Sequence, residues 1–472
     1  MKQKFDWKDF LKKLAILGIP VALQNLLSTT GSMVDTMMIA VLGEKTVGAI
    51  GLCSQFSSLM FSCYWGFVGG GMLFMAQYWG AKDIDGMDRS YGMTWTCMMS
   101  IAVIFCVLAT CFPSFIMNIY TDKPNIQEIG IPYLKIVGFA YPLTVFSMAA
   151  SAFLRSTERV RIPLAASIAS VLTNVFFNYV LISGKLGFPA LGVQGAAIAT
   201  VIAGFVNLAV ILILAKCRDY PYLFHFRRHF RWDVPHTKEF FKKCFPVICN
   251  ELSMGVANAI ISIVLGRQSE EAIAAIAVFG TIEGLFIGFF EGFSNSASVL
   301  VGKEVGAGKL DLAYERAKRL AYCCGAGILI LCLILLGIQT PVLSALGLSG
   351  ESLRLGQGMM MIFSVIIVIR MMNWVQNDTY RSAGDAVTGT VLEITFMYFL
   401  VLPALLLAAF LWKLPFLLIF ACRYIDEPIR FVLMQIHMYS GRWVRPVTPE
   451  GQKALVAFRE KHHIPEKRRK TA

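Results

Sequence analysis

A long apolar segment near the N-terminus decides the class of fold: its sequence is LAILGIPVALQNLLSTTGSMVDTMMIAVL, residues 14–42. A helix needs about 20 predominantly apolar residues to cross the hydrocarbon core of a bilayer. The apolar core of a cleavable signal peptide is shorter, about 7–15 residues. The segment is therefore predicted to be a membrane-spanning helix and not a signal peptide.

Comparable apolar segments recur along the whole chain, at 47–78, 92–118, 131–154, 162–183, 191–215, 240–266, 272–302, 320–346, 355–380, 388–412 and 414–437. Only 15% of the 472 residues are charged and 56% are hydrophobic, whereas soluble proteins carry about 25% charged residues. We predict an all-α integral membrane protein with twelve transmembrane helices.

The basic residues predict the orientation of these helices. Most of the 43 Lys and Arg residues fall at the N-terminus, in alternate loops and in the C-terminal tail. Cytoplasmic loops carry such an excess, so both termini of this multi-pass protein are predicted to lie on the cytoplasmic side of the cell (inner) membrane. The net charge of +13 then indicates cytoplasmic loops, not a nucleic-acid partner.

Sequence motifs for catalysis or for stable metal binding are absent from the chain. The twelve cysteines form no CxxC pair, no HExxH pattern occurs, and there is no GxxxxGK[ST] loop for ATP. A membrane-embedded enzyme would need a cluster of catalytic residues at one membrane face, and no such cluster is found. We therefore predict no enzyme activity, no cofactor, and an ion gradient as the energy source.

An internal repeat divides the chain into two halves. A shift of 226 positions aligns Pro20-Val21 with Pro246-Val247, Ala49-Ile50 with Ala275-Ile276, Gly80-Ala81 with Gly306-Ala307, and Arg155-Ser156 with Arg381-Ser382. Parallel repeats of six helices occur in transporters, where the two halves are related by an axis along the membrane normal. The predicted parts are two pseudo-twofold-related six-helix lobes, residues 1–222 and 223–440, and a basic cytoplasmic tail, residues 441–472.

The tail contains one further structural signal. Thr448-Pro449-Glu450 has the pattern of a helix start, with a capping residue followed by proline in the first turn. The predicted helix could lie on the inner leaflet or be solvated, and the sequence leaves both options open.

Several stretches together resemble the multidrug and toxic compound extrusion (MATE) family over nearly the whole chain. They are PVALQNLLSTTGSMVDTMMIAVLG (20–43), AQYWGAKD (76–83), LRSTERVRIP (154–163), NVFFNYVLISGKLGFPALGVQGAAIAT (174–200), VGKEVGAGK (301–309) and SGRWVRPVT (440–448). The resemblance implies a monomeric secondary active antiporter with a V-shaped cleft. Such a protein exports organic cations or amphipathic drugs in exchange for H⁺ or Na⁺ by alternating access within membrane lipids.

The resemblance also implies an ion-coupling site in the first lobe. An Asp in the first span is the hallmark of the family's cation site, which here matches Asp35, with Asn174, Asn178 and Thr200 as its partners. A buried carboxylate can exchange a proton, and Asp35 with Asn174 could ligate Na⁺ because hard cations prefer oxygen. Some family members have an acid where this chain has Asn178, so the chain lacks one charge for Na⁺. A purely structural acid is the alternative.

The second lobe contains its own polar residues within predicted spans. They are candidates for a substrate site or a second polar site: Glu251, Glu283, Glu291, Arg370 and Asp378. Ionisable side chains inside a membrane are costly and mark functional sites by default, although structural ion pairing is the alternative for them. Arg370 and Asp378 are eight residues apart, too far along a helix to pair directly, so Arg370 is expected to neutralise an acid on another helix.

Two further interpretations follow from these charges. Asp426, Glu427 and Arg430 have the spacing of a local ion pair. The alternative function is a flippase for a lipid or a lipid-linked precursor with the same two-lobe fold. A flippase is expected to have more cationic side chains in its cleft, so the mostly acidic intramembrane charges favour export of cations.

Overall fold

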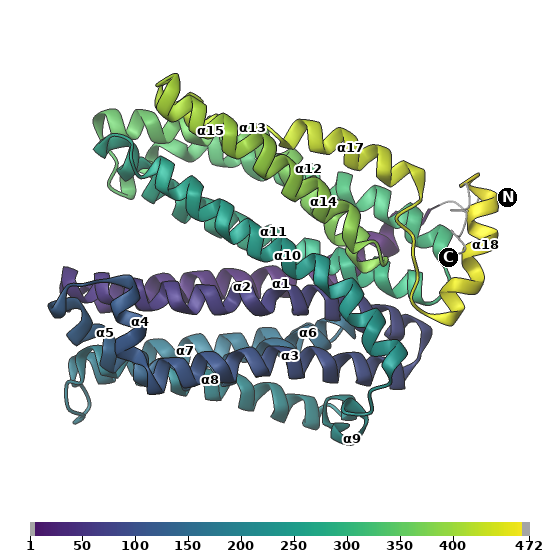
Figure 1. The fold of residues 1–472 in the computed structure, drawn as a ribbon, viewed down its shortest axis with the longest axis horizontal. Coiled ribbons are helices and arrows are strands. Elements are labelled where there is room, and N and C mark those ends of the chain that lie inside the picture. The colour runs from purple at the N-terminus through teal and green to yellow at the C-terminus, as the bar shows by residue number, and fades with distance from the viewer. Residues whose placement is uncertain (1–4, 465–472) are drawn as a thin grey trace. The chain divides into compact units, whose positions relative to one another are not determined.

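The structure is a computed structural model, and it describes residues 5–464 (Figure 1). Among these residues the secondary structure is helical, with no β-strand. The all-α fold predicted from the sequence is thereby confirmed. Residues 465–472 of the predicted tail lie outside the described part.

The helices of the first repeat follow one another with short connections. They are α1 (Trp7–Ala40), α2 (Glu44–Ala81), α3 (Ile84–Cys111), α4 (Pro113–Tyr120), α5 (Pro124–Val137), α6 (Ala140–Ser156), α7 (Arg161–Ser183) and α8 (Gly192–Cys217). The connection to the second repeat contains the short helices η1 (Pro221–Phe224) and α9 (Phe226–His229).

The second repeat begins with four long helices, and its later helices are interrupted. The elements are α10 (Val234–Leu265), α11 (Glu270–Gly306), α12 (Leu310–Ala345), α13 (Gly350–Ser382), α14 (Ala386–Phe396), η2 (Met397–Val401), α15 (Leu402–Leu406), η3 (Leu407–Leu411), α16 (Phe416–Cys422), α17 (Glu427–Ser440) and α18 (Pro449–Lys461). The elements η2 and η3 are π-helical turns within the run from α14 to residue 411.

The helix starts reproduce the internal repeat. The starts of α2 and α11, of α3 and α12, and of α5 and α13 are each 226 positions apart. The two halves differ at one place. The first repeat has two helices there, α5 and α6, with a bend of 48° between them, whereas the corresponding α13 of the second repeat is one continuous helix. The repeat inferred from the sequence is therefore also a repeat of secondary structure.

Ten helices of the described chain are long and apolar enough to cross a membrane, and the bent pair α5–α6 makes eleven. The twelfth predicted segment, 414–437, is divided into α16 and α17 by residues 423–426. Pro428 lies in the first turn of α17, where the missing proline N–H does no harm, but a continuous helix through this position would lose a hydrogen bond. The interruption thus has a cause in the sequence.

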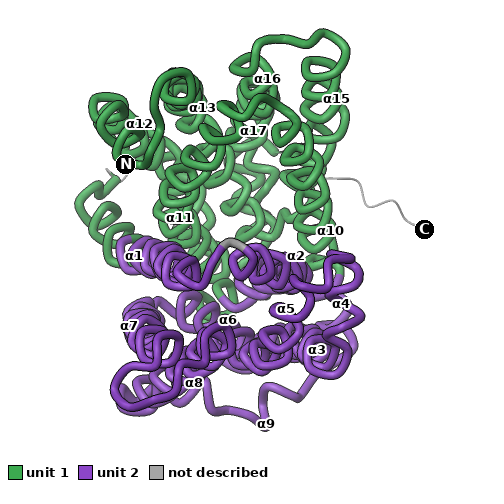
Figure 2. Tube along the Cα trace, turned by 90° about the vertical axis from the view of Figure 1, so that its left-hand side faces the viewer, with its two compact units in different colours: residues 1–18, 76–83, 242–472 green, residues 19–75, 84–241 purple. Residues whose placement is uncertain are grey.

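The chain forms two compact units that do not follow the repeat boundary. Unit 1 contains residues 1–18, 76–83 and 242–472, and unit 2 contains residues 19–75 and 84–241 (Figure 2). The first turns of α1 and the last turn of α2 therefore belong to unit 1. The lobe boundary drawn from the sequence stays a prediction.

The interior of unit 1 contains an apolar cluster rich in aromatic rings. Phe279 contacts Phe363 and Phe420 edge to face, with ring centroids 5.2 Å apart in both pairs. All three side chains are fully buried. In unit 2, α7 packs along α8, and α6 packs against α8 and α3.

The C-terminal tail begins a helix where the sequence predicts one. Thr448 is the N-cap of α18, and its hydroxyl accepts a hydrogen bond from the Gly451 N–H at 3.2 Å. Phe458 of α18 packs in an apolar cluster with Tyr314 and Trp443. The described tail is therefore docked on unit 1 by an apolar contact.

Candidate functional site

A polar cavity lies inside unit 2, between α1, α6, α7 and α8. Its volume is about 370 Å³, and most of the residues that line it have hydroxyl or amide side chains. Asp35 is the one ionisable residue among the lining residues. The cavity therefore combines many hydrogen-bonding groups with a single carboxylate.

The polar lining on α1 comes from a stripe along one helix face. Gln24, Ser28, Ser32 and Asp35 follow one another at spacings of four, four and three residues, and residues at such spacings share a helix face. The hydroxyl groups of Ser28 and Ser32 donate to the main-chain oxygens four residues earlier, at 3.0 and 3.1 Å. Their oxygen atoms can still accept hydrogen bonds from a molecule in the cavity.

Asp35 is held by an amide from α7. The Asn178 side-chain nitrogen donates to Asp35 Oδ1 at 2.6 Å and to Asn174 Oδ1 at 3.1 Å. Asn178 is fully buried, while Asn174 and Thr200 line the cavity with Asp35. The Thr200 hydroxyl donates to the Ala196 carbonyl at 3.0 Å. The four residues predicted for this site therefore lie together, although Thr200 is not directly bonded to Asp35.

The electrostatic environment of Asp35 is unusual for a half-buried acid. Among the described residues, no Lys, Arg or His nitrogen lies within 4 Å of its carboxylate. Burying a charge without a counter-charge is costly, so such a group favours uptake of a proton or a cation. Within residues 5–464, no group of three or more His, Cys, Asp or Glu side chains is arranged to hold a metal ion.

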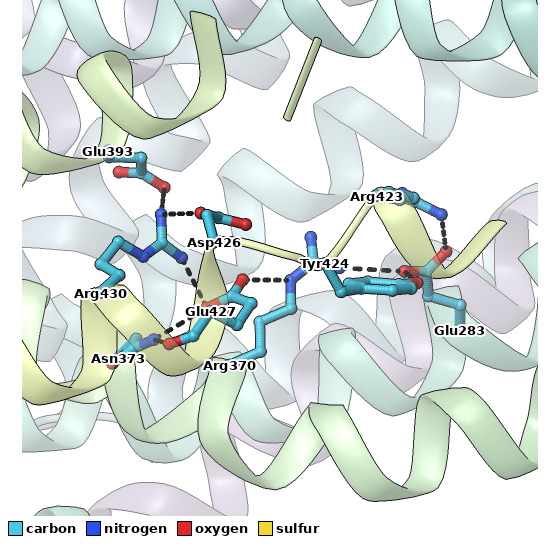
Figure 3. Close-up of polar contacts among 9 residues, drawn as sticks. All are labelled: Glu283, Arg370, Asn373, Glu393, Arg423, Tyr424, Asp426, Glu427 and Arg430. Atoms are coloured by element: carbon cyan, nitrogen blue, oxygen red, sulfur yellow. Dashed lines mark hydrogen bonds and ion pairs between the residues drawn. The ribbon is translucent and has the colours of Figure 1, made fainter. Parts of the chain in front are cut away.

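A carboxylate–arginine network runs through unit 1, made of Glu283, Arg370, Glu393, Arg423, Asp426, Glu427 and Arg430 (Figure 3). At one end, Glu283 of α11 pairs with Arg423 at 3.1 Å and with Arg370 of α13 at 3.3 Å. The Tyr424 hydroxyl also donates to Glu283, at 3.2 Å. Glu283 is therefore neutralised by two arginines.

The other end of the network is centred on Arg430. This guanidinium lies 2.9 Å from Glu427, 3.5 Å from Asp426 and 3.7 Å from Glu393. Glu427 also lies 3.6 Å from Arg370, which joins the two ends (Figure 3). Three carboxylates thus share Arg430, and Glu427 is also paired with Arg370.

A second group in unit 1, the Arg381 cluster, contains Arg381, Glu251, Asp378 and Ser294. Arg381 lies 3.6 Å from Glu251 and 3.9 Å from Asp378. The Ser294 hydroxyl donates a hydrogen bond to Asp378. Glu251 and Asp378 were predicted as polar-site residues, and the structure brings them to the same arginine.

The structure tests two sequence expectations about these charges. Arg370 pairs with Glu283 and Glu427 on other helices and not with Asp378, which confirms the expectation from helix spacing. The local pairing of Asp426 and Glu427 with Arg430 is also confirmed. Glu291 lies elsewhere on α11, and its carbonyl accepts a hydrogen bond from the Asn295 side chain at 3.0 Å.

Sequence reasoning missed several members of these sites. It missed the α1 stripe, although the four-residue spacing of Gln24, Ser28 and Ser32 is visible in the sequence. It also missed Arg423 as a partner of Glu283, and no local signal could have found that pair because the two residues are 140 positions apart.

The repeated apolar helices and the polar groups buried among them define the class of protein: a polytopic α-helical membrane protein. The sequence profile of the MatE family matches residues 20–180 and 246–412. The chain therefore belongs to the MatE family. The two matched stretches begin 226 positions apart, in agreement with the repeat.

Similar proteins cover almost the full length of the chain. A relative from Bacillus subtilis, described as "Probable multidrug resistance protein YoeA", is 23% identical over 444 residues, which are 93% of this chain and 94% of the relative. Another from the same organism, "Uncharacterized transporter YisQ", is 22% identical over 414 residues, 87% of this chain and 90% of the relative.

Solved structures share the fold. The chain superposes on the Vibrio cholerae MATE transporter VcmN, in its D35N mutant, with a TM-score of 0.81 at 14% identity, covering 95% of this chain and 98% of that one. A crystal structure described as MATE in the bent conformation gives a TM-score of 0.79 at 17% identity, covering 96% and 97%. The protein therefore has the two-lobe MATE fold. As a member of the MatE family, it is a multi-pass membrane transporter and not an enzyme.

Proposed function

We propose that this protein is a secondary active antiporter that exports organic cations or amphipathic drugs in exchange for H⁺, with Na⁺ as the alternative coupling ion. It lies in the cell membrane with both termini in the cytoplasm, and its two lobes alternate access to the site. The observation that carries this proposal is Asp35, which lines a polar cavity and has no cationic partner within the described part of the chain.

The relatives support the substrate class. YoeA is described as a probable multidrug resistance protein, and so is NorM of Rhizobium meliloti, which is 26% identical over 327 residues. In this cavity one carboxylate attracts a cationic substrate, and the hydroxyl and amide groups around it can form hydrogen bonds in several directions. The substrate does not have to match a fixed set of ion pairs. That chemistry suits small organic cations of varied shape.

The geometry of Asn178 favours a proton over Na⁺ as the coupling ion. Its side chain turns the amide N–H toward Asp35, so this residue supplies a donor and not an oxygen ligand. Na⁺ needs several oxygen ligands, and the Asn174 oxygen already accepts from Asn178. A proton needs only one oxygen of Asp35.

Coupling follows from competition for one negative charge. An ionised Asp35 attracts a cationic substrate, whereas a protonated Asp35 is neutral and does not. Inward proton movement down its gradient would then release the substrate on the outer side. Because proton and substrate exclude each other at one carboxylate, each transport cycle exchanges one for the other.

The experiment that tests the proposal is export of a fluorescent lipophilic cation from proteoliposomes. Wild type, Asp35→Asn and the exposed control Asp122→Asn are compared under an imposed H⁺ gradient and, separately, a Na⁺ gradient. We expect wild type and Asp122→Asn to export the cation when an H⁺ gradient is imposed. In Asp35→Asn the export rate should fall to that of liposomes without protein. Export that survives in Asp35→Asn would remove Asp35 from the coupling step. Export driven only by Na⁺ would replace the proton with the alternative ion.

A lipid flippase is the second candidate because unit 1 contains arginines in the carboxylate–arginine network and in the Arg381 cluster. Each of Arg370, Arg381, Arg423 and Arg430 is paired with a carboxylate, however, so they leave no free cationic surface for an anionic headgroup. The same proteoliposomes with a labelled anionic lipid distinguish the two candidates. Flipping of that lipid without cation export would favour the flippase.

A further inference from the structure

The last turns of α2 and α11 meet at two glycines that the repeat relates to each other. A Cβ atom on Gly80 would overlap the main-chain oxygen of Lys303, and one on Gly306 would overlap the main-chain oxygen of Gln77. Gln77 and Lys303 are 226 positions apart, as are Gly80 and Gly306. The contact is therefore reciprocal, and it joins the end of a first-repeat helix to the end of its second-repeat counterpart, within unit 1.

A segment of the tail crosses this contact. We name residues 441–448 the strap. The Thr448 hydroxyl of the strap donates to the Gly306 carbonyl at the end of α11, at 2.7 Å. The Arg445 N–H donates to the Ala383 carbonyl after the end of α13, at 2.9 Å. The strap thus touches two helix ends of the second repeat.

Gln77 connects the strap to the first repeat. Its side-chain oxygen accepts from the Val447 N–H at 2.8 Å, and its nitrogen donates to the Ser382 carbonyl at 2.7 Å. The residue is fully buried, so an unmade hydrogen bond there would be costly. This one side chain holds the end of α2 to both the strap and the end of α13.

The strap is anchored on both sides of these contacts. Before them, the Trp443 ring nitrogen donates to the Met438 carbonyl of α17 at 2.9 Å. After them, Lys461 at the end of α18 pairs with Asp311 of α12 at 2.8 Å. Gly384 has a φ of +96°, and a Cβ there would overlap the Arg445 carbonyl oxygen. The strap therefore passes directly over the backbone at the end of α13.

We propose that the strap is a conformational latch, which keeps the α2 and α11 ends together until its bonds to Gln77 break. The proposal rests on the proposed function in one respect: export by alternating access requires this face, assigned to the cytoplasm, to open. Opening between the repeats would separate the two glycines. Gln77, the first-repeat member, would then lose its bonds to Val447 and Ser382. The tail thus controls how easily the face opens.

Hydrogen–deuterium exchange followed by mass spectrometry tests the latch on the full chain in nanodiscs. The variant is Gln77→Met, which keeps a similar side-chain length but removes both hydrogen bonds. The matched control is Gln376→Met, because Gln376 of α13 is equally buried but its amide atoms have no hydrogen-bond partner in the structure. The segments followed are 76–83, 300–307, 379–385 and 441–448.

In Gln77→Met we expect exchange to rise about tenfold in all four segments together, since two buried hydrogen bonds of ordinary strength are lost. Gln376→Met should leave the four segments at the wild-type rate. A rise confined to 441–448 would mean that the tail frays without holding the helix ends, and would overturn the latch. No rise in Gln77→Met, or an equal rise in both variants, would overturn it as well.

A second variant covers the case in which Gln77→Met does not fold. Thr448→Val removes the hydroxyl bond to Gly306 and the N-cap bond from the Gly451 N–H. It leaves α2 untouched, and the same joint rise is expected. The exchange readout requires neither substrate nor ion gradient. Failure of the latch is therefore distinguishable from failure of the transport proposal, which the proteoliposome assay measures.

Discussion

Asp35 in unit 2 and the carboxylates of unit 1 differ in what stabilises their charge. Asp35 receives a hydrogen bond from an amide and faces a cavity. Six carboxylates of unit 1 each lie within 4 Å of an arginine: Glu251, Glu283, Asp378, Glu393, Asp426 and Glu427. An arginine stays charged at any working pH, so it supplies these carboxylates with a fixed counter-charge.

The difference teaches which acids have a fixed counter-charge within the protein and which acid does not. Removing the proton or cation from Asp35 leaves a charge that an amide and a polar cavity can stabilise in part. Replacing Glu283 by a neutral residue, by contrast, would leave Arg370 and Arg423 without the carboxylate that they share, which is unfavourable. We therefore expect substitutions in unit 1 to affect stability first, and substitutions at Asp35 to affect transport first.

The largest expected loss of stability is for Arg430→Met. This change leaves Glu393, Asp426 and Glu427 without their shared arginine. Breaking a buried ion pair from one side costs about 3–5 kcal/mol. The free energy of unfolding in mixed micelles should fall by that amount. A loss below about 1 kcal/mol, the range of an exposed ion pair, would mean that the network is solvated and does not stabilise the unit.

The next largest effect is expected on stability in acid. One group outside the membrane spans of each unit, His229 in unit 2 and Asp385 in unit 1, should determine it, each in its own pH range. Burial lowers the pKa of His229 to about 4, partly offset by its hydrogen bond to the Tyr222 carbonyl. Between pH 6.5 and 4 the unfolded chain then binds a proton at this histidine and the folded chain does not. The contribution of His229 to the free energy of unfolding is therefore fully present above pH 6.5, and it falls by up to about 3 kcal/mol toward pH 4.

In unit 1, Asp385 responds at lower pH. Burial raises the pKa of this carboxyl, but the hydrogen bond from His437 and the charge of Arg445 hold it below its usual range. Its contribution is therefore present above about pH 4 and is lost as the pH falls further. Unfolding curves of His229→Gln and Asp385→Asn, measured from pH 7 to 3, check both signs. A His229→Gln curve that still declines between pH 6.5 and 4 as in wild type would contradict the assignment to His229.

A smaller effect is expected for Arg370→Met. Glu283 keeps Arg423 at 3.1 Å, and Glu427 keeps Arg430 at 2.9 Å, so no carboxylate loses its last arginine. We expect a loss of about 1–3 kcal/mol in the free energy of unfolding. If Arg370→Met were as destabilising as Arg430→Met in the same assay, the expectation would be contradicted. The link that Arg370 makes between Glu283 and Glu427 would then contribute more to stability than the number of arginines that each carboxylate keeps.

The smallest effect on stability is expected for Asp35→Asn. The substitution removes a charge that has no cationic partner and leaves an amide beside Asn178, so the unfolding free energy should change by less than about 1 kcal/mol. Transport should nevertheless be lost. A strongly destabilised Asp35→Asn protein would instead indicate that Asp35 is a structural acid.

The sequence predicted much of the fold for physical reasons that are local. Apolar runs of sufficient length predict helices in lipid whatever surrounds them, and the 226-residue repeat is visible as matched pairs such as Gly80 and Gly306. The start of α18 at Thr448 was also predicted, since capping depends on a few adjacent residues. The division of the last span into α16 and α17 was not, although Pro428 carries the signal.

The candidate site was predicted in part. Asp35 and Asn178 were proposed from the family resemblance and are bonded at 2.6 Å, yet they are 143 positions apart and nothing in the local sequence joins them. The number of intramembrane charges could be read from the chain, but not their pairing.

The sequence by itself determined the helical membrane class, the repeat and the presence of ionisable groups inside the spans, because each depends on composition or short-range spacing. Only the tertiary structure decided that Asp35 faces a cavity without an arginine, that Glu283 has two arginines, and that Gln77 is bound by the tail. These pairings depend on which helices pack together, and side-chain spacing along one helix does not specify the neighbour that a buried charge will meet.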